Sequence, residues 1–267
     1  MSIFWILLIV ALAISAIGWK RFLYFISLGY GLSIAGCAVA LVIVFWHQLT
    51  LPTALLCLIL FVYGCRLGGY LLFREIKSAS YRKALSDNVN EGTYPFGVTF
   101  AIWVSCALLY MAEVAPVAAR LSNMADGLPV DMLWAWIGVV VMSAGVLLET
   151  IADAQKSAAK KKEPRQFVCT GLYRLVRCPN YFGEVIVWTG CLLVCIGACC
   201  TWWQWLISII GYAGIVYVMF SGARRLEIRQ NKNYGDDPNY RAYAKNTPIL
   251  IPFLPIYSVE RFKWLRG

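Results

Sequence analysis

The sequence predicts an all-α integral membrane bundle of seven transmembrane helices, with the N-terminus outside and the C-terminus in the cytoplasm. Three observations support this fold class. The chain of 267 residues is 60% hydrophobic and only 14% charged, whereas a soluble domain carries about a quarter charged residues. Seven apolar runs approach or reach the ~20 residues that cross ~30 Å of hydrocarbon. Basic residues gather on one predicted side of the membrane.

The apolar runs follow one another along the chain, so residues 1–267 are interpreted as a single membrane domain. The spans are expected at 3–18, 22–46, 52–73, 97–119, 132–151, 182–199 and 202–220. The first run has no basic segment before it and no small-residue cleavage site after it, so a helix is favoured over a signal peptide. The last two runs are separated only by Cys199–Thr201, and their combined length favours a hairpin of two helices over one bent element.

The orientation follows from the charge bias. The chain carries 24 Lys and Arg against 14 Asp and Glu. With seven spans, 22 of the 24 basic residues fall on one side, which leaves Arg66 inside a span and Arg120 on the other face. Because basic loops stay in the cytoplasm, that side, which includes Arg82, Lys83 and the run Lys160–Lys162, is predicted to be cytoplasmic.

Composition excludes several classes of function. A single histidine, His47, excludes a histidine metal cluster and argues against a Ser–His–Asp triad. The ten cysteines contain no C-x-x-C pair, and Cys191, Cys195 and Cys199 recur every four residues, which predicts one packed stripe of a helix. The basic residues are spread over membrane-proximal loops, so they are expected to contact membrane lipids and not nucleic acid.

Ionisable residues inside spans are costly and point to function. Tyr63, Arg66 and Tyr70 are three and four residues apart, which places them on one face of the third span. Arg66 needs an anion or a dipole inside the bundle, and structural pairing with Glu113 of the fourth span is the alternative.

The cytoplasmic ends of the later spans carry more polar groups. Glu149 and Asp153 share a face at the end of the fifth span, where acids at a membrane interface are also common. Asn180 and Glu184 share a face in the first turn of the sixth span, after Arg174 and Arg177. Pro179 suits a helix start, Gly183 permits close backbone approach, and two arginines before a helix N-terminus form a local anion site, which favours a ligand.

The C-terminal tail repeats this pattern. Arg225 and Arg229 share a helical face after the last span, and Tyr243 follows in Tyr-x-x-Tyr. A solvated basic face is one interpretation, and closure of a pocket around a phosphorylated cofactor is the other. The G-x-G at Gly29 and Gly31 lies in mid-span without a preceding strand, which indicates helix packing and not a dinucleotide fold.

The segment 171–184 reads G-L-Y-R-L-V-R-C-P-N-Y-F-G-E. It resembles the signature of the steroid 5α-reductase-like superfamily, whose bacterial DUF1295 members usually read G-L-x-R-x-S-R-H-P-N-Y-x-G-E, with Cys178 here in place of His. The Tyr63-x-x-Arg66 pair with Tyr70, the Ala-Glu of the fourth span and Asp153 before a basic stretch are also similar. The resemblance covers about residues 60–255, so 61–255 are expected to form a reductase-like core behind variable spans in 1–60.

The resemblance implies an NADPH-dependent reductase that transfers a hydride to the C=C bond of an enone in a steroid-like or isoprenoid lipid from the bilayer. Tyr63 matches the catalytic tyrosine, with help expected from Glu113, while Arg66 and Tyr70 would orient the substrate or nicotinamide. The residues expected to contact NADPH are Glu149, Asp153, Arg174, Asn180, Tyr181, Glu184, Arg225, Arg229 and Tyr243. The bacterial form of the signature favours a bacterial inner membrane, or the endoplasmic reticulum in a eukaryote, with the cofactor side cytoplasmic.

One departure and one alternative remain. Steroid 5α-reductases carry a Gln-Glu pair in the second span, whereas the first two spans here contain no acid or amide. This difference argues against a steroid substrate more than it argues against the reductase chemistry. The alternative is a SAM-dependent membrane methyltransferase acting on a lipid or prenylated substrate, since such enzymes have a similar loop. In that case Arg177 and Glu227 would contact the methyl donor, but Asn180 and Glu184 favour the reductase.

Overall fold

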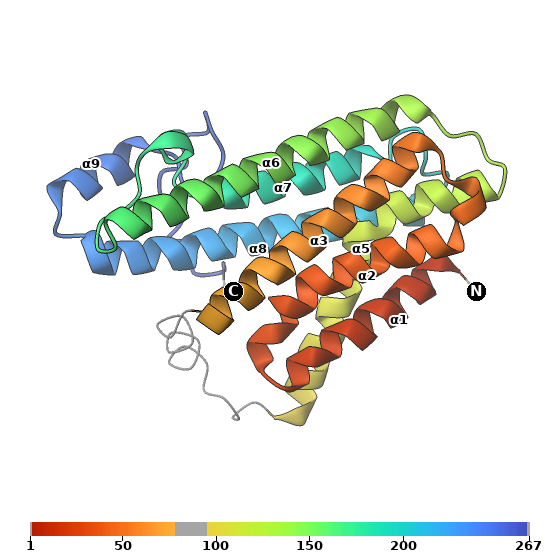
Figure 1. Ribbon diagram of the computed structural model, residues 1–267, viewed down its shortest axis with the longest axis horizontal. Coiled ribbons are helices and arrows are strands. Elements are labelled where there is room, and N and C mark those ends of the chain that lie inside the picture. Colours follow the sequence, from red (N-terminus) through yellow and green to blue (C-terminus); the bar gives the residue numbers. More distant parts are fainter. Residues whose placement is uncertain (1, 78–94, 266–267) are drawn as a thin grey trace. The chain divides into compact units, whose positions relative to one another are not determined.

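The computed structural model describes residues 2–77 and 95–265, and every regular element within these ranges is helical (Figure 1). The α-helices are α1 (Ile3–Ser15), α2 (Leu28–Val44), α3 (Leu51–Lys77), α5 (Phe96–Ala125), α6 (Met132–Lys162), α7 (Pro179–Leu193), α8 (Trp202–Tyr234) and α9 (Pro238–Asn246). Short 3₁₀ helices lie at Ala16–Trp19, Phe22–Phe25, Trp46–Gln48 and Gly171–Arg174. The predicted all-α class is confirmed.

Five of the described segments are long and apolar enough to cross a membrane, which indicates an integral membrane protein. They are Phe22–Val44, Leu51–Tyr70, Phe96–Ala125, Met132–Lys162 and Trp202–Tyr234. The other two predicted spans correspond to α1, with 13 residues, and α7, with 15, and each is shorter than ~30 Å at ~1.5 Å per residue. The count of seven spans and the orientation stay predictions, and Arg82 and Lys83 lie outside the described residues.

An outward-facing apolar stripe on α6 fits a helix in lipid. Leu133, Val140, Leu147 and Ile151 recur at helical spacing and are 48–66% exposed. A soluble protein rarely leaves such a continuous apolar face in water. The helix has 31 residues, so at ~1.5 Å per residue it exceeds the ~30 Å hydrocarbon layer and its charged end projects beyond it.

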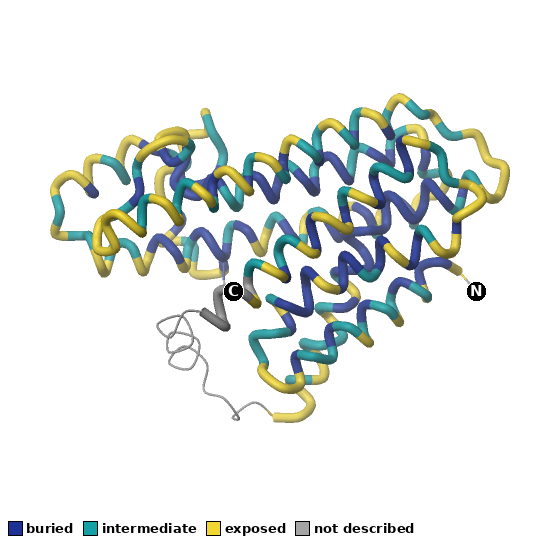
Figure 2. The backbone as a smooth tube through the Cα atoms, in the orientation of Figure 1, coloured by how far each residue is buried: buried dark blue, intermediate teal, exposed yellow. Residues whose placement is uncertain are grey.

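The chain divides into two compact units. Unit 1 comprises Met1–Val139 and Cys191–Tyr212, and unit 2 comprises Val140–Gly190 and Ala213–Gly267. In unit 1, α1, α2, α3 and α5 pack against one another (Figure 1). Figure 2 shows most of α2 as buried, because α2 contacts the other three helices.

Glycines bring α2 and α3 into backbone contact. A Cβ atom on Gly31 would lie 2.8 Å from the Gly64 carbonyl oxygen, and a Cβ on Gly64 would lie 2.4 Å from the Gly31 oxygen. Only glycine permits this approach. The interpretation of Gly29 and Gly31 as helix-packing residues is confirmed, since a Cβ on Gly29 would also lie 3.2 Å from the Cα atom of Ser15 in α1.

The prediction that Cys191, Cys195 and Cys199 form one stripe of a helix is wrong, because α7 ends before Cys195. This helix ends at Leu193, so Cys195 and Cys199 lie in the turns that follow, where Gly197 has a φ of +67°. The fully buried Arg120 ends the helix by donating hydrogen bonds to the carbonyl oxygens of residues 194, 196 and 131 at 2.7–3.3 Å. The cysteines are packed as expected, but not on one helix.

In unit 2, α7 lies side by side with α6 (Figure 1). A Cβ on Gly145 would lie 2.6 Å from the Val187 nitrogen, and one on Gly190 would lie 2.7 Å from the Met142 nitrogen. Pro179 is the first residue of α7, as predicted.

The predicted hairpin of two helices in the last two apolar runs is confirmed, because α7 and α8 are separate helices and not one bent element.

Candidate functional site

The predicted site residues fall into two groups. Tyr63, Arg66, Tyr70 and Glu113, predicted to act on the substrate, belong to unit 1. All nine residues predicted to contact the cofactor belong to unit 2. Each group is described by itself.

In unit 1, Tyr63 of α3 is fully buried and shares a hydrogen bond with Tyr30 of α2, with 2.9 Å between the hydroxyl oxygens. Tyr110 of α5 packs on the Tyr30 ring at 5.1 Å between centroids. Glu113, one turn further along α5, is 2% exposed. Arg66 and Tyr70 lie on α3 at intermediate exposure.

In unit 2, the start of α7 packs tightly on α6. A Cβ on Gly183 would lie 2.8 Å from the Glu149 nitrogen and 3.0 Å from its Cβ, so the predicted close approach at Gly183 is confirmed. Glu149 and Glu184 are both buried. The Asn180 Oδ1 atom is buried and has no hydrogen-bond partner among the residues that the structure describes. This turn therefore presents an amide oxygen that a ligand can satisfy.

Tyr181 connects α7 with α8. Its ring would lie 3.3 Å from a Cβ on Gly222, and its hydroxyl is within electrostatic range of Glu184, Arg225 and Arg229. Both arginines are exposed on α8. Four of the nine predicted cofactor residues are thus brought together at one end of unit 2.

The other predicted residues lie around this region. Asp153 is partly exposed on α6, and Arg174 is exposed in the 3₁₀ turn before α7. The Tyr243 hydroxyl donates a hydrogen bond to the Tyr173 carbonyl oxygen at 2.7 Å. Burial raises the pKa of Tyr243 and, against the opposing charge of Arg177, that of Tyr240, so both phenols stay protonated at neutral pH.

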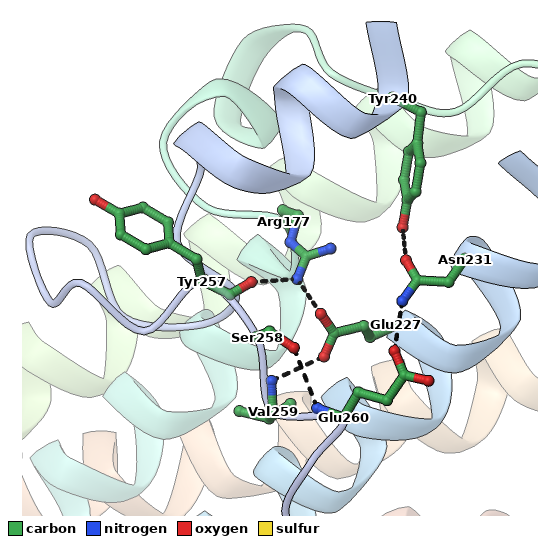
Figure 3. Close-up of polar contacts among 8 residues, drawn as sticks. All are labelled: Arg177, Glu227, Asn231, Tyr240, Tyr257, Ser258, Val259 and Glu260. Carbon is green, nitrogen blue, oxygen red and sulfur yellow. Dashed lines mark hydrogen bonds and ion pairs between the residues drawn. The ribbon is translucent and has the colours of Figure 1, made fainter. Parts of the chain in front are cut away.

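Arg177 is buried and anchors the C-terminal tail (Figure 3). Its Nη2 atom lies 2.6 Å from Glu227 Oε1 and 2.6 Å from the Tyr257 carbonyl oxygen. The Val259 N–H donates to Glu227 Oε2 at 2.8 Å. Asn231 continues the network, since it accepts from the Tyr240 hydroxyl and donates to Glu260. The two arginines predicted to form one anion site therefore lie in different environments. Arg174 is exposed, and Arg177 forms a buried ion pair with Glu227.

A cavity of ≈ 220 Å³ lies beside Arg177. It is lined by Lys156, Lys160, Phe167, Val168, Tyr173, Arg177, Leu226, Arg229, Gln230, Asn233 and Tyr234. All of these residues are described, and four are cationic while none is acidic. Arg177 Nε and Nη1 and Gln230 Oε1 are buried without a hydrogen-bond partner in the described part of the chain. The two Arg177 nitrogens are unsatisfied donors, whereas Gln230 Oε1 is an acceptor. Because Glu227 already balances the charge of Arg177, the net positive charge of the cavity comes from Lys156, Lys160 and Arg229, and this combination of charge and donors suits an anion.

Sequence reasoning missed most of this cavity. Lys160 was interpreted as a topology signal, yet its Nζ atom donates to the carbonyl oxygens of Pro164 and Gln166 and to the Tyr234 hydroxyl at 2.5–3.2 Å. These acceptors are neutral, and the Nζ atom also lies 5.4 Å from the centroid of the Tyr234 ring, so none of these contacts is with a carboxylate. The spacing Lys156-x-x-x-Lys160 on one helical face is the signal that could have identified it.

A family model described as a protein of unknown function (DUF1295) matches residues 18–247. The chain belongs to this family. The predicted resemblance to the steroid 5α-reductase-like superfamily is confirmed, because several curated relatives of this DUF1295 chain are reductases. No solved structure matches it.

Three relatives illustrate the similarity. Steroid 5-alpha-reductase DET2 of Arabidopsis thaliana is 27% identical over 131 residues, which cover 46% of this chain and 45% of the relative. Polyprenal reductase of Danio rerio is 23% identical over 172 residues, 62% of this chain and 52% of the relative. Steroid 5-alpha-reductase DET2 of Solanum lycopersicum is 29% identical over 136 residues, with coverages of 45% and 44%. The chain spans about half the length of these curated relatives.

Proposed function

We propose that this chain is an NADPH-dependent integral membrane reductase that reduces the C=C bond of an enone in a steroid-like or isoprenoid lipid. Its relatives include enzymes named for reduction of a steroid and of a polyprenal, and both names imply a lipid substrate. The reaction would then be of the 3-oxo-5α-steroid 4-dehydrogenase type.

The observation that carries the cofactor assignment is the cationic cavity of unit 2. NADPH contains a diphosphate and a phosphate monoester, all anionic, whereas SAM carries a sulfonium cation and no phosphate. No acid is among the described lining residues, and Lys156, Lys160 and Arg229 add positive charge beyond that of Arg177, which Glu227 balances. This charge would stabilise the first kind of ligand and repel the second. The cavity thus favours the reductase over the methyltransferase.

The volume of the cavity indicates which part of the cofactor it would take. At ≈ 220 Å³ it is smaller than the ~300 Å³ of the smallest drug-sized pockets, so it suits a phosphate-bearing end and not a whole dinucleotide. Arg177, with two unsatisfied nitrogens, and Arg229 would hold the phosphate. Asn180, Tyr181, Glu184, Glu149, Asp153, Arg174, Arg225 and Tyr243 would contact the rest of the cofactor.

The position of the cavity along the helices supports a cofactor from the aqueous phase. About 20 residues of α6 and α8 suffice to cross the hydrocarbon layer. Lys156 and Lys160 lie after the first 20 residues of α6, and Leu226 to Tyr234 lie after the first 20 of α8. These ends therefore project into water, where NADPH is dissolved.

The chemistry follows from the residues of the chain. NADPH, when bound, supplies the hydride that reduces the β-carbon of the enone. Negative charge then develops on the enone oxygen, and a hydrogen bond from the Tyr63 hydroxyl would stabilise it. A proton that comes ultimately from solvent would then be added to the α-carbon, which converts the enolate to the saturated carbonyl compound. Tyr63 is fully buried, so a lipid must enter the helix bundle to reach it, and water is excluded there.

The test is thermal stabilisation of the detergent-purified chain by NADPH, NADH and SAM measured side by side. We expect a shift with NADPH that is reduced in Arg229→Gln, which removes a cavity cation. Arg241→Gln on α9 is the matched control, since Arg241 is exposed and does not line the cavity. A shift with SAM alone would refute the reductase in favour of the methyltransferase.

A further inference from the structure

Tyr30 of the second predicted span shares a buried hydrogen bond with Tyr63. The hydroxyl oxygens of Tyr30 and Tyr63 lie 2.9 Å apart, with both side chains buried at 7% and 0% exposure. The rings meet edge to face, with centroids 6.3 Å apart. No acid or amide was available in this span, so the sequence alone gave no partner for Tyr63 here.

The backbone of α2 and α3 holds the two tyrosines in this position. Gly31 and Gly64 directly follow Tyr30 and Tyr63, and each would clash with the opposite carbonyl oxygen if it carried a Cβ. The two helices are therefore in backbone contact directly after the two tyrosines in the sequence. A pair held by rigid backbone contact keeps its geometry when a ligand enters.

Tyr110 supports Tyr30 from the other side. Its ring packs on Tyr30 at 5.1 Å with an interplanar angle of 34°. Its own hydroxyl donates to the Phe25 carbonyl oxygen at 2.5 Å. Because that hydrogen is committed to the backbone, the Tyr110 hydroxyl stays outside the pair, and only the Tyr110 ring, which a phenylalanine would keep, contacts Tyr30.

We propose that Tyr30 is a positioning residue that donates a hydrogen bond to the Tyr63 oxygen, and so orients and strengthens Tyr63 as the donor to the enone oxygen. This inference rests on the proposed function. A phenol that accepts one hydrogen bond is polarised and donates its own more strongly. When charge develops on the enone oxygen, the Tyr30–Tyr63 pair spreads it over two hydroxyl groups in a water-free interior.

The experiment compares Tyr30→Phe, Tyr63→Phe and Tyr110→Phe in the full-length chain with NADPH and two enone probes, a 3-oxo-Δ4 steroid and a polyprenal. Tyr30→Phe is expected to lower kcat about tenfold, the effect of one hydrogen bond, with KM little changed. Tyr63→Phe is expected to lower kcat by ~100-fold or more. Tyr110→Phe removes a buried hydroxyl outside the pair and is expected to retain kcat.

A second readout needs no turnover. The carbonyl stretching frequency of each bound enone, measured by infrared difference spectroscopy with NADP⁺, falls when its oxygen accepts a hydrogen bond. Tyr30→Phe should raise the carbonyl frequency part of the way back to that of the unbound enone, and Tyr63→Phe should raise it further. A Tyr30→Phe variant that unfolds at a lower temperature but keeps both kcat and the carbonyl frequency would overturn the proposal, because the pair would then only join two helices.

The outcomes separate the inference from the function on which it rests. Loss of kcat in Tyr63→Phe without loss in Tyr30→Phe refutes the role of Tyr30 and leaves the reductase intact. Equal loss in Tyr30→Phe and Tyr110→Phe refutes it as well, because the effect would then come from packing. A wild-type chain that NADPH does not stabilise and that reduces neither probe refutes the proposed function, and the role of Tyr30 with it.

Discussion

Replacement of Glu227 by leucine should release the C-terminal tail. The Arg177 and Glu227 side chains are only 1% and 3% exposed, and their ion pair is 2.6 Å long. Removal of one partner leaves a buried guanidinium without its counter-charge, which costs about 3–5 kcal/mol. The Val259 N–H also loses its acceptor. We therefore expect about 4 kcal/mol of lost stability, a fall in Tm of roughly 10 °C.

The assay is thermal unfolding in detergent, followed by intrinsic tryptophan fluorescence, together with limited chymotrypsin digestion. Glu227→Leu should expose the chain near Tyr257 to rapid cleavage. Glu260→Gln is the matched control, since Glu260 lies in the same segment but makes an exposed hydrogen bond with Asn231. Its loss should change the free energy of unfolding by about 0.5 kcal/mol or less.

The reasoning is refuted if Glu227→Leu loses no more stability than Glu260→Gln. The double variant Arg177→Met with Glu227→Leu adds a further check. Removing both charges should recover most of the loss, because replacement of a whole buried ion pair by apolar side chains is often near neutral. A double variant as unstable as the sum of the two single variants would show that the charges do not act as a pair.

Three further predictions concern unit 2. Lys156→Gln should weaken NADPH binding about tenfold and NADH binding less, because a charge-assisted contact to the extra phosphate of NADPH is lost. Fluorescence titration with each cofactor gives the two dissociation constants, and equal weakening of both would contradict the prediction. Gly183→Ala should lower the free energy of unfolding by about 1–3 kcal/mol, because the added methyl group would lie 2.8 Å from the α6 backbone. Thermal unfolding at the wild-type temperature would argue against this contact. Burial raises the pKa of Cys178 to about 12, so this thiol stays protonated and should resist maleimide at pH 8 to 10. The exposed Cys200 should be labelled quickly under the same conditions. Peptide mass spectrometry after a timed pulse compares the two cysteines, and similar labelling would refute the assignment.

Hydrophobic periodicity and local helix signals predicted the fold because they depend on neighbouring residues alone. The long apolar runs became helices, Pro179 begins α7, and Gly183 lies against α6. The end of α7 could not be predicted in this way. It depends on Arg120, 74 residues away along the chain from Val194, and a buried side chain that binds helix-terminal carbonyl oxygens leaves no pattern near the helix that it ends.

The candidate site was predictable only where its residues occur in a short motif. Asn180, Tyr181 and Glu184 share one loop and the first turn of α7, so their spacing alone indicated a common role. Tyr30 had no such signal, because its hydrogen bond with Tyr63 joins residues 33 positions apart. The cavity likewise combines the end of α6 with the end of α8, and the spacing of Lys156 and Lys160 on one helical face does not by itself tell which residues of α8 they meet.

The glycine contacts between α6 and α7 limit how the protein can move. Gly145, Gly183 and Gly190 each meet backbone atoms of the opposite helix at distances that leave no room for a methyl group. Sliding or rotation of one helix on the other would drive a bulkier neighbour into the same narrow space. The two helices are therefore expected to move together as one stiff block. Under the proposed function, exchange of the cofactor would then require movement of the projecting end of α8, of the α9 helix or of the tail held by the Arg177–Glu227 pair.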